Sequence, residues 1–174
     1  MTVKPKQTIA QNKLILLYLL RSGAMQFSEL QLMRIASELT LMSYFDLKES
    51  LFELVQNDHA TQIVTPNSIL YEATENGLRI VDVMENDIRL SFREAIDSYL
   101  EKHRDALKKE SQFVAEYIKL PNNEYRVILK VLEKNATVFE INVIVYSKDE
   151  AKTLIRNWKD NAVSLYKDIL LRLS

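Results

Sequence analysis

Residues 60–77 read ATQIVTPNSILYEATENG, a segment in which two strand-forming runs are separated by a turn. The runs 60–64 and 69–73 are short and rich in residues that favour strands. Residues 65–68, Thr-Pro-Asn-Ser, carry the chemistry of a turn. We therefore predict a β-hairpin. Thr74 follows it at once and can cap a helix that reaches about Glu85.

Three helices are predicted before the hairpin, because three capping signals occur upstream of it. Each signal is a hydroxyl residue followed three positions later by a polar acceptor, namely Thr8 with Gln11, Ser28 with Gln31 and Ser43 with Asp46. Apolar residues at helical spacing continue each signal. We expect these helices to end near Gly23, Leu39 and Asn57.

A long helix and three strands are predicted after the hairpin unit. Ser91 with Glu94 caps a helix over residues 92–109, and strand-forming runs follow at 113–120, 124–133 and 137–146. Short turns join these runs, so they form an antiparallel meander. Two helices should cover it, one that begins after Ser147 and a second that begins after a break at Asp160 and Asn161. The second helix should face the core with Leu165, Tyr166, Ile169, Leu170 and Leu173.

The predicted fold class is therefore α+β. We expect an N-terminal helix-and-hairpin domain over residues 1–90, a long linking helix over 91–110, and a domain over 111–174 with a three-stranded antiparallel sheet and two helices. The composition of the 174 residues agrees, because 47% hydrophobic and 27% charged residues with only 2 Gly and 3 Pro exclude a disordered or low-complexity chain.

No apolar run is long enough to span a membrane, and no signal peptide is present, so we expect a cytoplasmic protein without a membrane partner. The absence of cysteine removes disulfides, thiolate metal sites and cysteine nucleophiles together. His59 and His103 are the only histidines, and neither has the spacing of a metal motif. We therefore expect no metal, no cofactor and no catalytic site, and we do not expect an enzyme.

The order of elements is similar to that of a winged helix-turn-helix domain, in which the third helix reads DNA and the hairpin is the wing. Residues 71–77 resemble the junction between wing and helix in such regulators. The whole chain also resembles a bacterial family called domain of unknown function 4364, through residues 11–18, 97–100 and 157–159. This resemblance implies a transcriptional regulator; it implies no ligand and no catalytic residues.

The charge of the predicted third helix is unusual for a DNA reader. On a helical wheel its outward residues are Phe45, Glu49, Phe52, Glu53 and Gln56, and Lys48 on the flank is its only cation. Residues 1–84 carry 7 Lys and Arg against 9 Asp and Glu, and residues 65–68 carry no cation. Because DNA affinity depends on neutralising phosphates, this face opposes DNA binding. The alternative for the two phenylalanines is that they pack inside the domain.

The second half of the linking helix carries a cluster of cations, Lys102, Arg104, Lys108 and Lys109. They alternate with acidic residues at i, i+3 and i+4, a pattern typical of a solvated helix face. Phosphate contact by this cluster is the alternative.

Two functions follow. The first is a DNA-binding transcriptional regulator that contacts duplex DNA through Ser43, Tyr44 and Lys48 of the third helix and Thr65, Asn67 and Ser68 of the hairpin. The second is a protein interaction module whose partner meets Phe45, Glu49, Phe52 and Glu53. We also expect a homodimer, with the linking helix or the apolar first helix as its seam.

Overall fold

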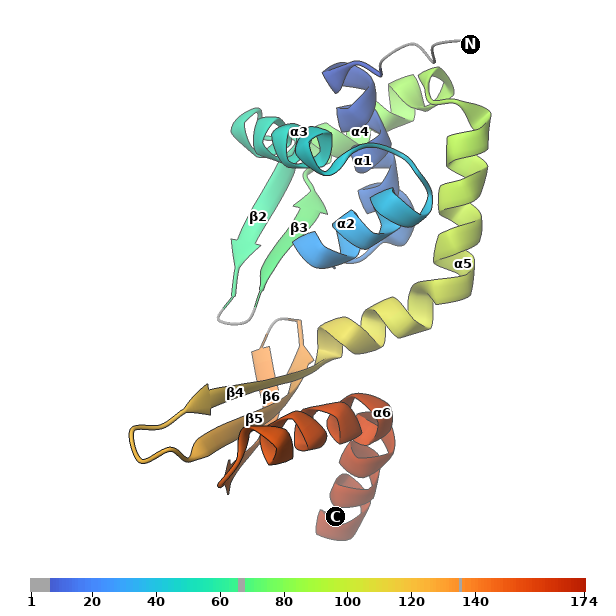
Figure 1. Cartoon of the computed structure of the whole chain (residues 1–174). Coiled ribbons are helices and arrows are strands. Elements are labelled where there is room, and N and C mark those ends of the chain that lie inside the picture. The colour runs from blue at the N-terminus through green and yellow to red at the C-terminus, as the bar shows by residue number, and fades with distance from the viewer. Residues whose placement is uncertain (1–6, 66–67, 135) are drawn as a thin grey trace. The chain divides into compact units, whose positions relative to one another are not determined.

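The computed structural model describes residues 7–65, 68–134 and 136–174 (Figure 1). The chain divides into two compact units, Met1–Asp105 and Ala106–Ser174. The boundary lies inside one continuous helix, in the region where the sequence predicts the linking helix.

The first unit contains helices and a small sheet in the predicted order. Its elements are α1 (Ile9–Gly23), β1 (Phe27–Ser28), α2 (Glu29–Glu38), α3 (Tyr44–Gln56), β2 (Ala60–Val64), β3 (Ile69–Ala73), α4 (Glu75–Met84), the 3-10 turn η1 (Glu85–Asp87) and the first part of α5 (Leu90–Gln112). The hairpin strands have the predicted bounds. The sequence does not predict β1. This strand pairs antiparallel with β3 and gives the sheet order β1-β3-β2.

The helix starts form as the capping signals predict. Thr8 and Ser28 accept hydrogen bonds from the backbone N–H of Gln11 and Gln31, and each glutamine side chain accepts one in return. Ser43 caps α3 in a similar way and accepts from the backbone N–H of Asp46. These bonds satisfy N–H groups that have no partner within their own helix.

The core of the first unit is built around α1. Leu14–Leu20 are all buried, and α3 packs on this helix with Leu47, Leu51 and Leu54 inward. Because the apolar run of α1 is enclosed within its own unit, it has no free surface that could form a dimer seam.

A close approach of two backbones fixes the entry to α4. A Cβ atom at Gly77 would overlap the backbone carbonyl oxygen of His59. The same carbonyl accepts a hydrogen bond from the N–H of Thr74, whose side chain accepts from the N–H of Gly77 and donates to the carbonyl of Asp58. Residue 77 therefore has to be glycine for α4 to start against the end of α3.

The second unit is a three-stranded antiparallel sheet with one long helix on it. Its strands β4 (Phe113–Lys119), β5 (Tyr125–Glu133) and β6 (Ala136–Val145) pair in sequence order, and α6 (Lys148–Leu173) follows them (Figure 1). The helix α6 packs on the sheet through Trp158 and Ala162, which are buried in one cluster with Val127, Leu129 and Val131.

The prediction of two C-terminal helices is wrong, because α6 is continuous through Asp160 and Asn161. Both residues are exposed, and the side chain of Asn161 donates to the carbonyl of Asn157 within the same helix. Asp and Asn cost a helix only about half a kcal/mol each relative to alanine, so two such residues on an exposed face need not end it. The expected core contacts of the last turns are also incomplete, because Leu165, Leu170 and Leu173 are exposed.

Candidate functional site

One face of α3 exposes aromatic side chains to solvent. Phe45 is 80% exposed and Phe52 is 66% exposed, and Glu49 lies between them on the same face. The two phenylalanines therefore do not pack inside the unit. Large apolar side chains this exposed typically mark an interaction surface when they are grouped.

The cations next to this face are paired with acids of the same unit. Lys48 Nζ lies 2.8 Å from both carboxylate oxygens of Glu29 on α2, and this hydrogen bonding raises the pKa of Lys48. Lys13 Nζ on α1 lies 2.7 Å from Glu53. Glu53 therefore turns towards α1 and does not lie free on the exposed face. Both lysines are therefore already neutralised by acids of this unit, and neither is free to pair with a DNA phosphate.

The hydroxyl groups named as DNA contacts have local structural roles. Ser43 caps α3 and also donates to Asp46 Oδ2 at 2.6 Å. Thr65 donates to the carbonyl of Ser68 and accepts from its N–H, so these two residues hold the hairpin turn together. Tyr44 is half exposed. Asn67 lies outside the described residues.

A surface pocket of about 370 Å³ lies between α2 and the start of α3. Its lining is mostly apolar with a few hydroxyl groups, from Met33, Ala36, Ser37, Thr40, Met42, Ser43, Tyr44 and Leu47. The pocket adjoins the exposed aromatic face, because Tyr44 lines it and the rings of Tyr44 and Phe45 meet edge to face with centroids 5.5 Å apart. The volume falls within the range of pockets that bind ligand groups.

Thr40 gives this pocket a strained wall. Its φ of 52° lies in the left-handed region, which a β-branched residue rarely adopts. The turn is nevertheless well bonded, because the N–H groups of Thr40 and Leu41 donate to the carbonyls of Ser37 and Ala36. This is the C-terminal helix motif that usually has glycine at the left-handed position.

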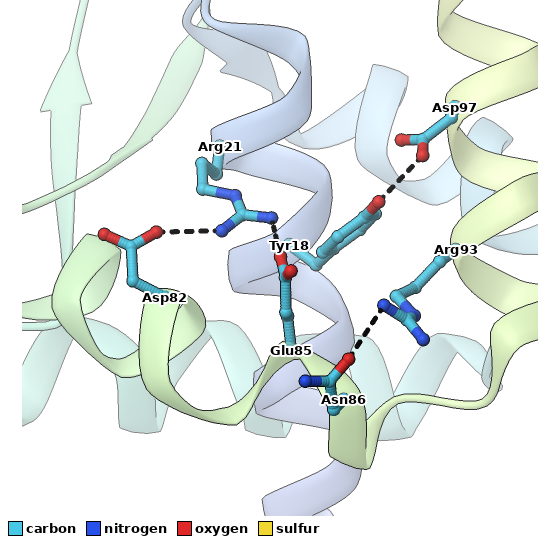
Figure 2. Close-up of polar contacts among 7 residues, drawn as sticks. All are labelled: Tyr18, Arg21, Asp82, Glu85, Asn86, Arg93 and Asp97. Carbon is cyan, nitrogen blue, oxygen red and sulfur yellow. Dashed lines mark hydrogen bonds and ion pairs between the residues drawn. The ribbon is translucent and has the colours of Figure 1, made fainter.

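A second polar cluster joins α1 to α4, η1 and α5 (Figure 2). Its members are Tyr18, Arg21, Asp82, Glu85, Asn86, Arg93 and Asp97. Tyr18 donates to Asp97 Oδ2 at 2.8 Å, and Arg21 forms ion pairs with Asp82 and Glu85. Burial, and then the hydrogen bond to Asp97, raise the pKa of Tyr18. Tyr18 and Asp97 each belong to a segment that carries the family resemblance, so this contact joins two of those segments within the first unit.

Arg104 has a structural role that the sequence did not indicate. Its guanidinium donates to the carbonyls of Ser22 and Gly23 at 3.1 and 3.2 Å, and it thereby caps the end of α1 from α5. At least this cation of the predicted solvated cluster is therefore engaged in the fold.

The described residues contain no group of three or more histidine, aspartate or glutamate side chains placed to hold a metal ion. Within the same residues, no helix combines the length and the hydrophobicity that crossing a bilayer requires.

The structure also brings together residues that the sequence did not connect. Met33 and Met42 flank the pocket, and the pairs of Lys13 with Glu53 and Lys48 with Glu29 join different helices. The partners in these pairs are 40 and 19 positions apart in the chain. Such contacts have no local pattern, so a single sequence gives no signal for them.

Comparison with known families gives a match that covers nearly the whole chain. Residues 12–173 match the model of a family described as Domain of unknown function (DUF4364). No curated protein and no solved structure matches the chain. Because the match spans both units, the chain belongs to the DUF4364 family.

Proposed function

We propose that this chain is a winged-helix module that binds a protein partner through the exposed face of α3. The order of α1, α2, α3 and the β2–β3 hairpin supports the winged-helix assignment. The observation that carries the function is the exposure of Phe45 and Phe52 on either side of Glu49, on the helix that would enter the groove of DNA in a DNA-binding domain.

The charge of this face favours protein over DNA. Duplex DNA carries one negative charge per about 1.7 Å of axis, so a reader needs cations on the surface that enters the groove. The α3 face offers Glu49 instead, and Lys48 is already paired with Glu29. Bringing Glu49 near phosphates would add repulsion without any compensating contact.

The apolar character of the face favours protein as well. Exposed aromatic side chains are enriched at the centres of protein interfaces, where removing one commonly costs more than about 1 kcal/mol of binding free energy. Phe45 and Phe52 are available for this role at no cost in refolding the unit, because they already point to solvent.

A DNA-binding transcriptional regulator is the second candidate, and the element order favours it. In that case Ser43, Tyr44 and Lys48 of α3 would meet DNA together with Thr65, Asn67 and Ser68 of the hairpin. Lys48 would first have to leave Glu29, and the hydroxyls of Ser43 and Thr65 would have to give up their present bonds.

A paired binding experiment tests the proposal. Duplex DNA of random sequence is titrated with the full chain at about 50 and about 200 mM salt, across which a DNA reader with several phosphate contacts loses affinity steeply. In parallel, a cell extract is passed over the immobilised chain, its F45A/F52A double variant, and V83A, a control at another exposed apolar residue that lies on α4. We expect no DNA binding that falls steeply with salt. We also expect a protein that the original chain and V83A retain and the double variant loses.

Steeply salt-dependent DNA binding that weakens in K48Q would overturn the proposal and establish the second candidate. Equal retention of every protein by the original chain and the double variant would also overturn it.

A further inference from the structure

We infer that the partner of the α3 face is a cationic amphipathic helix with a large apolar side chain that enters the pocket between α2 and α3. This inference rests on the proposed protein-binding function, and it specifies the chemistry of the partner.

The spacing on α3 suits a helical partner. Phe45, Glu49, Phe52 and Gln56 follow one another at intervals of four, three and four residues, so they form one stripe along the helix. This is the spacing with which one helix packs along another. The two phenylalanines are two turns apart, about 10 Å along the axis, so a partner helix meets both with apolar residues two turns apart.

The charge of the stripe selects a cationic partner. Glu49 is exposed between the two phenylalanines, and Asp46 lies in the first turn on the flank. The nearby lysines Lys13 and Lys48 are each held by an acid of this unit. A lysine or arginine on the partner, placed between its two apolar residues, would therefore meet Glu49 across the interface. Such complementary charge selects a partner and speeds its association more than it adds affinity.

The pocket provides an anchor at one end of the stripe. Tyr44 connects them, since it lines the pocket and packs against Phe45. Met33 and Met42 contribute flexible thioether side chains, which adapt to apolar groups of different shape. A pocket of about 370 Å³ with this lining has room for a large apolar side chain from the partner.

Two synthetic helical peptides of equal length test this inference on the full chain. One peptide is an amphipathic Leu/Lys helix, and the other has glutamate in place of every lysine. Fluorescence anisotropy of the labelled peptides measures binding at about 50 and about 200 mM salt. We expect the Leu/Lys peptide to bind, more weakly at the higher salt, and the Leu/Glu peptide not to bind.

Variants of the chain locate the bound peptide. F45A and F52A should each weaken binding about tenfold, the size expected for a central anchor. E49Q should weaken it several-fold and reduce its salt dependence, whereas E94Q, at an exposed acid of α5, should leave it unchanged. S37L fills the pocket from an exposed lining position and should weaken binding about tenfold, with S37A as its control. Thermal melts of each variant confirm that the fold is kept.

Binding of both peptides alike, or equal binding by F45A, E49Q and the unchanged chain, would overturn the inference. Equal binding by S37L would overturn the role of the pocket. These failures are distinct from failure of the proposed function. A protein that is retained by the original chain and lost by F45A/F52A would still support a protein-binding face, but one for a partner of different chemistry.

Discussion

Thr40 is a β-branched residue with a left-handed backbone conformation, which its side chain disfavours. It takes the left-handed position that ends α2, where glycine avoids a steric cost of about 1–2 kcal/mol for a residue with a Cβ. Thr40 is also one of the residues that line the pocket. Strain of this kind is often kept where a surface serves binding.

Replacing Thr40 with glycine should therefore stabilise the chain. The relief of strain exceeds the extra entropy that glycine brings to the unfolded chain, so we expect T40G to raise the free energy of unfolding by about 0.5–1 kcal/mol. Urea denaturation followed by circular dichroism measures it. T40A keeps the Cβ at a positive φ and should show no such gain. A loss of stability in T40G would contradict this account of the turn.

Arg104 shows how a side chain in a charged segment can bear on the fold. R104A would leave the carbonyls of Ser22 and Gly23 without their charged donor, and we expect the free energy of unfolding to fall by about 1–2 kcal/mol. K102A, at an exposed cation of the same helix, should change it by less than about 0.5 kcal/mol. Urea denaturation of both variants measures the contrast, and equal effects would mean that Arg104 contributes only its charge.

At the scale of elements, signals within each segment predicted most of the helices and strands. They missed the strand that depends on pairing with a distant segment of the chain. The β2–β3 hairpin, α2 and α3 have ends within about two residues of expectation, because caps, turns and periodicity lie within each segment. The strand β1 has two residues and exists only through its pairing with β3. The false break at Asp160 and Asn161 arose because residues that can cap a helix also occur on exposed helix faces.

Asn161 allows the continuity of α6 to be tested by the sign of a stability change. Inside a helix, alanine is preferred over asparagine, so N161A should raise the free energy of unfolding by about 0.5 kcal/mol. If Asn161 instead capped a separate last helix, the same substitution would lower it by about 1 kcal/mol. Thermal or urea denaturation distinguishes the two signs.

At the scale of the whole molecule, the charge count was predictable but the pairing of charges was not. The acidic excess of the first 84 residues follows from the sequence, and it disfavours DNA as a partner. Which acid neutralises Lys48 depends on how α2 and α3 pack. The outward placement of Phe45 and Phe52 followed from helical periodicity, whereas the pocket beside them depends on the turn at Thr40.

Alkaline pH should lower the free energy of unfolding, because tyrosines on several elements are buried in the folded state. Burial raises the pKa of Tyr18, Tyr71 and Tyr99 above the usual value of about 10. Above that pH the folded state holds more protons than the unfolded state, so the free energy of unfolding falls as pH rises through the folded pKa values and is unaffected by these groups below about pH 10. Urea midpoints between about pH 9 and 11 measure the fall.

The matched variants for this test are Y18F and Y146F. Y18F removes one titrating group and should show a shallower fall with pH, although it loses the bond to Asp97 at every pH. Y146F removes the hydroxyl of a tyrosine that is 74% exposed and serves as the control for the substitution itself. Equal slopes in all three proteins would exclude Tyr18 as a source of the alkaline sensitivity.

The close contact between Gly77 and the carbonyl of His59 predicts which residue other members of the family carry at this position. Because no side chain fits there, members of the family that keep this hairpin and helix should retain glycine three positions after the capping threonine. A member with a bulkier residue at that point would have to displace the start of α4 or reshape the end of the hairpin. Variation at this one position would therefore report where the architecture itself has diverged.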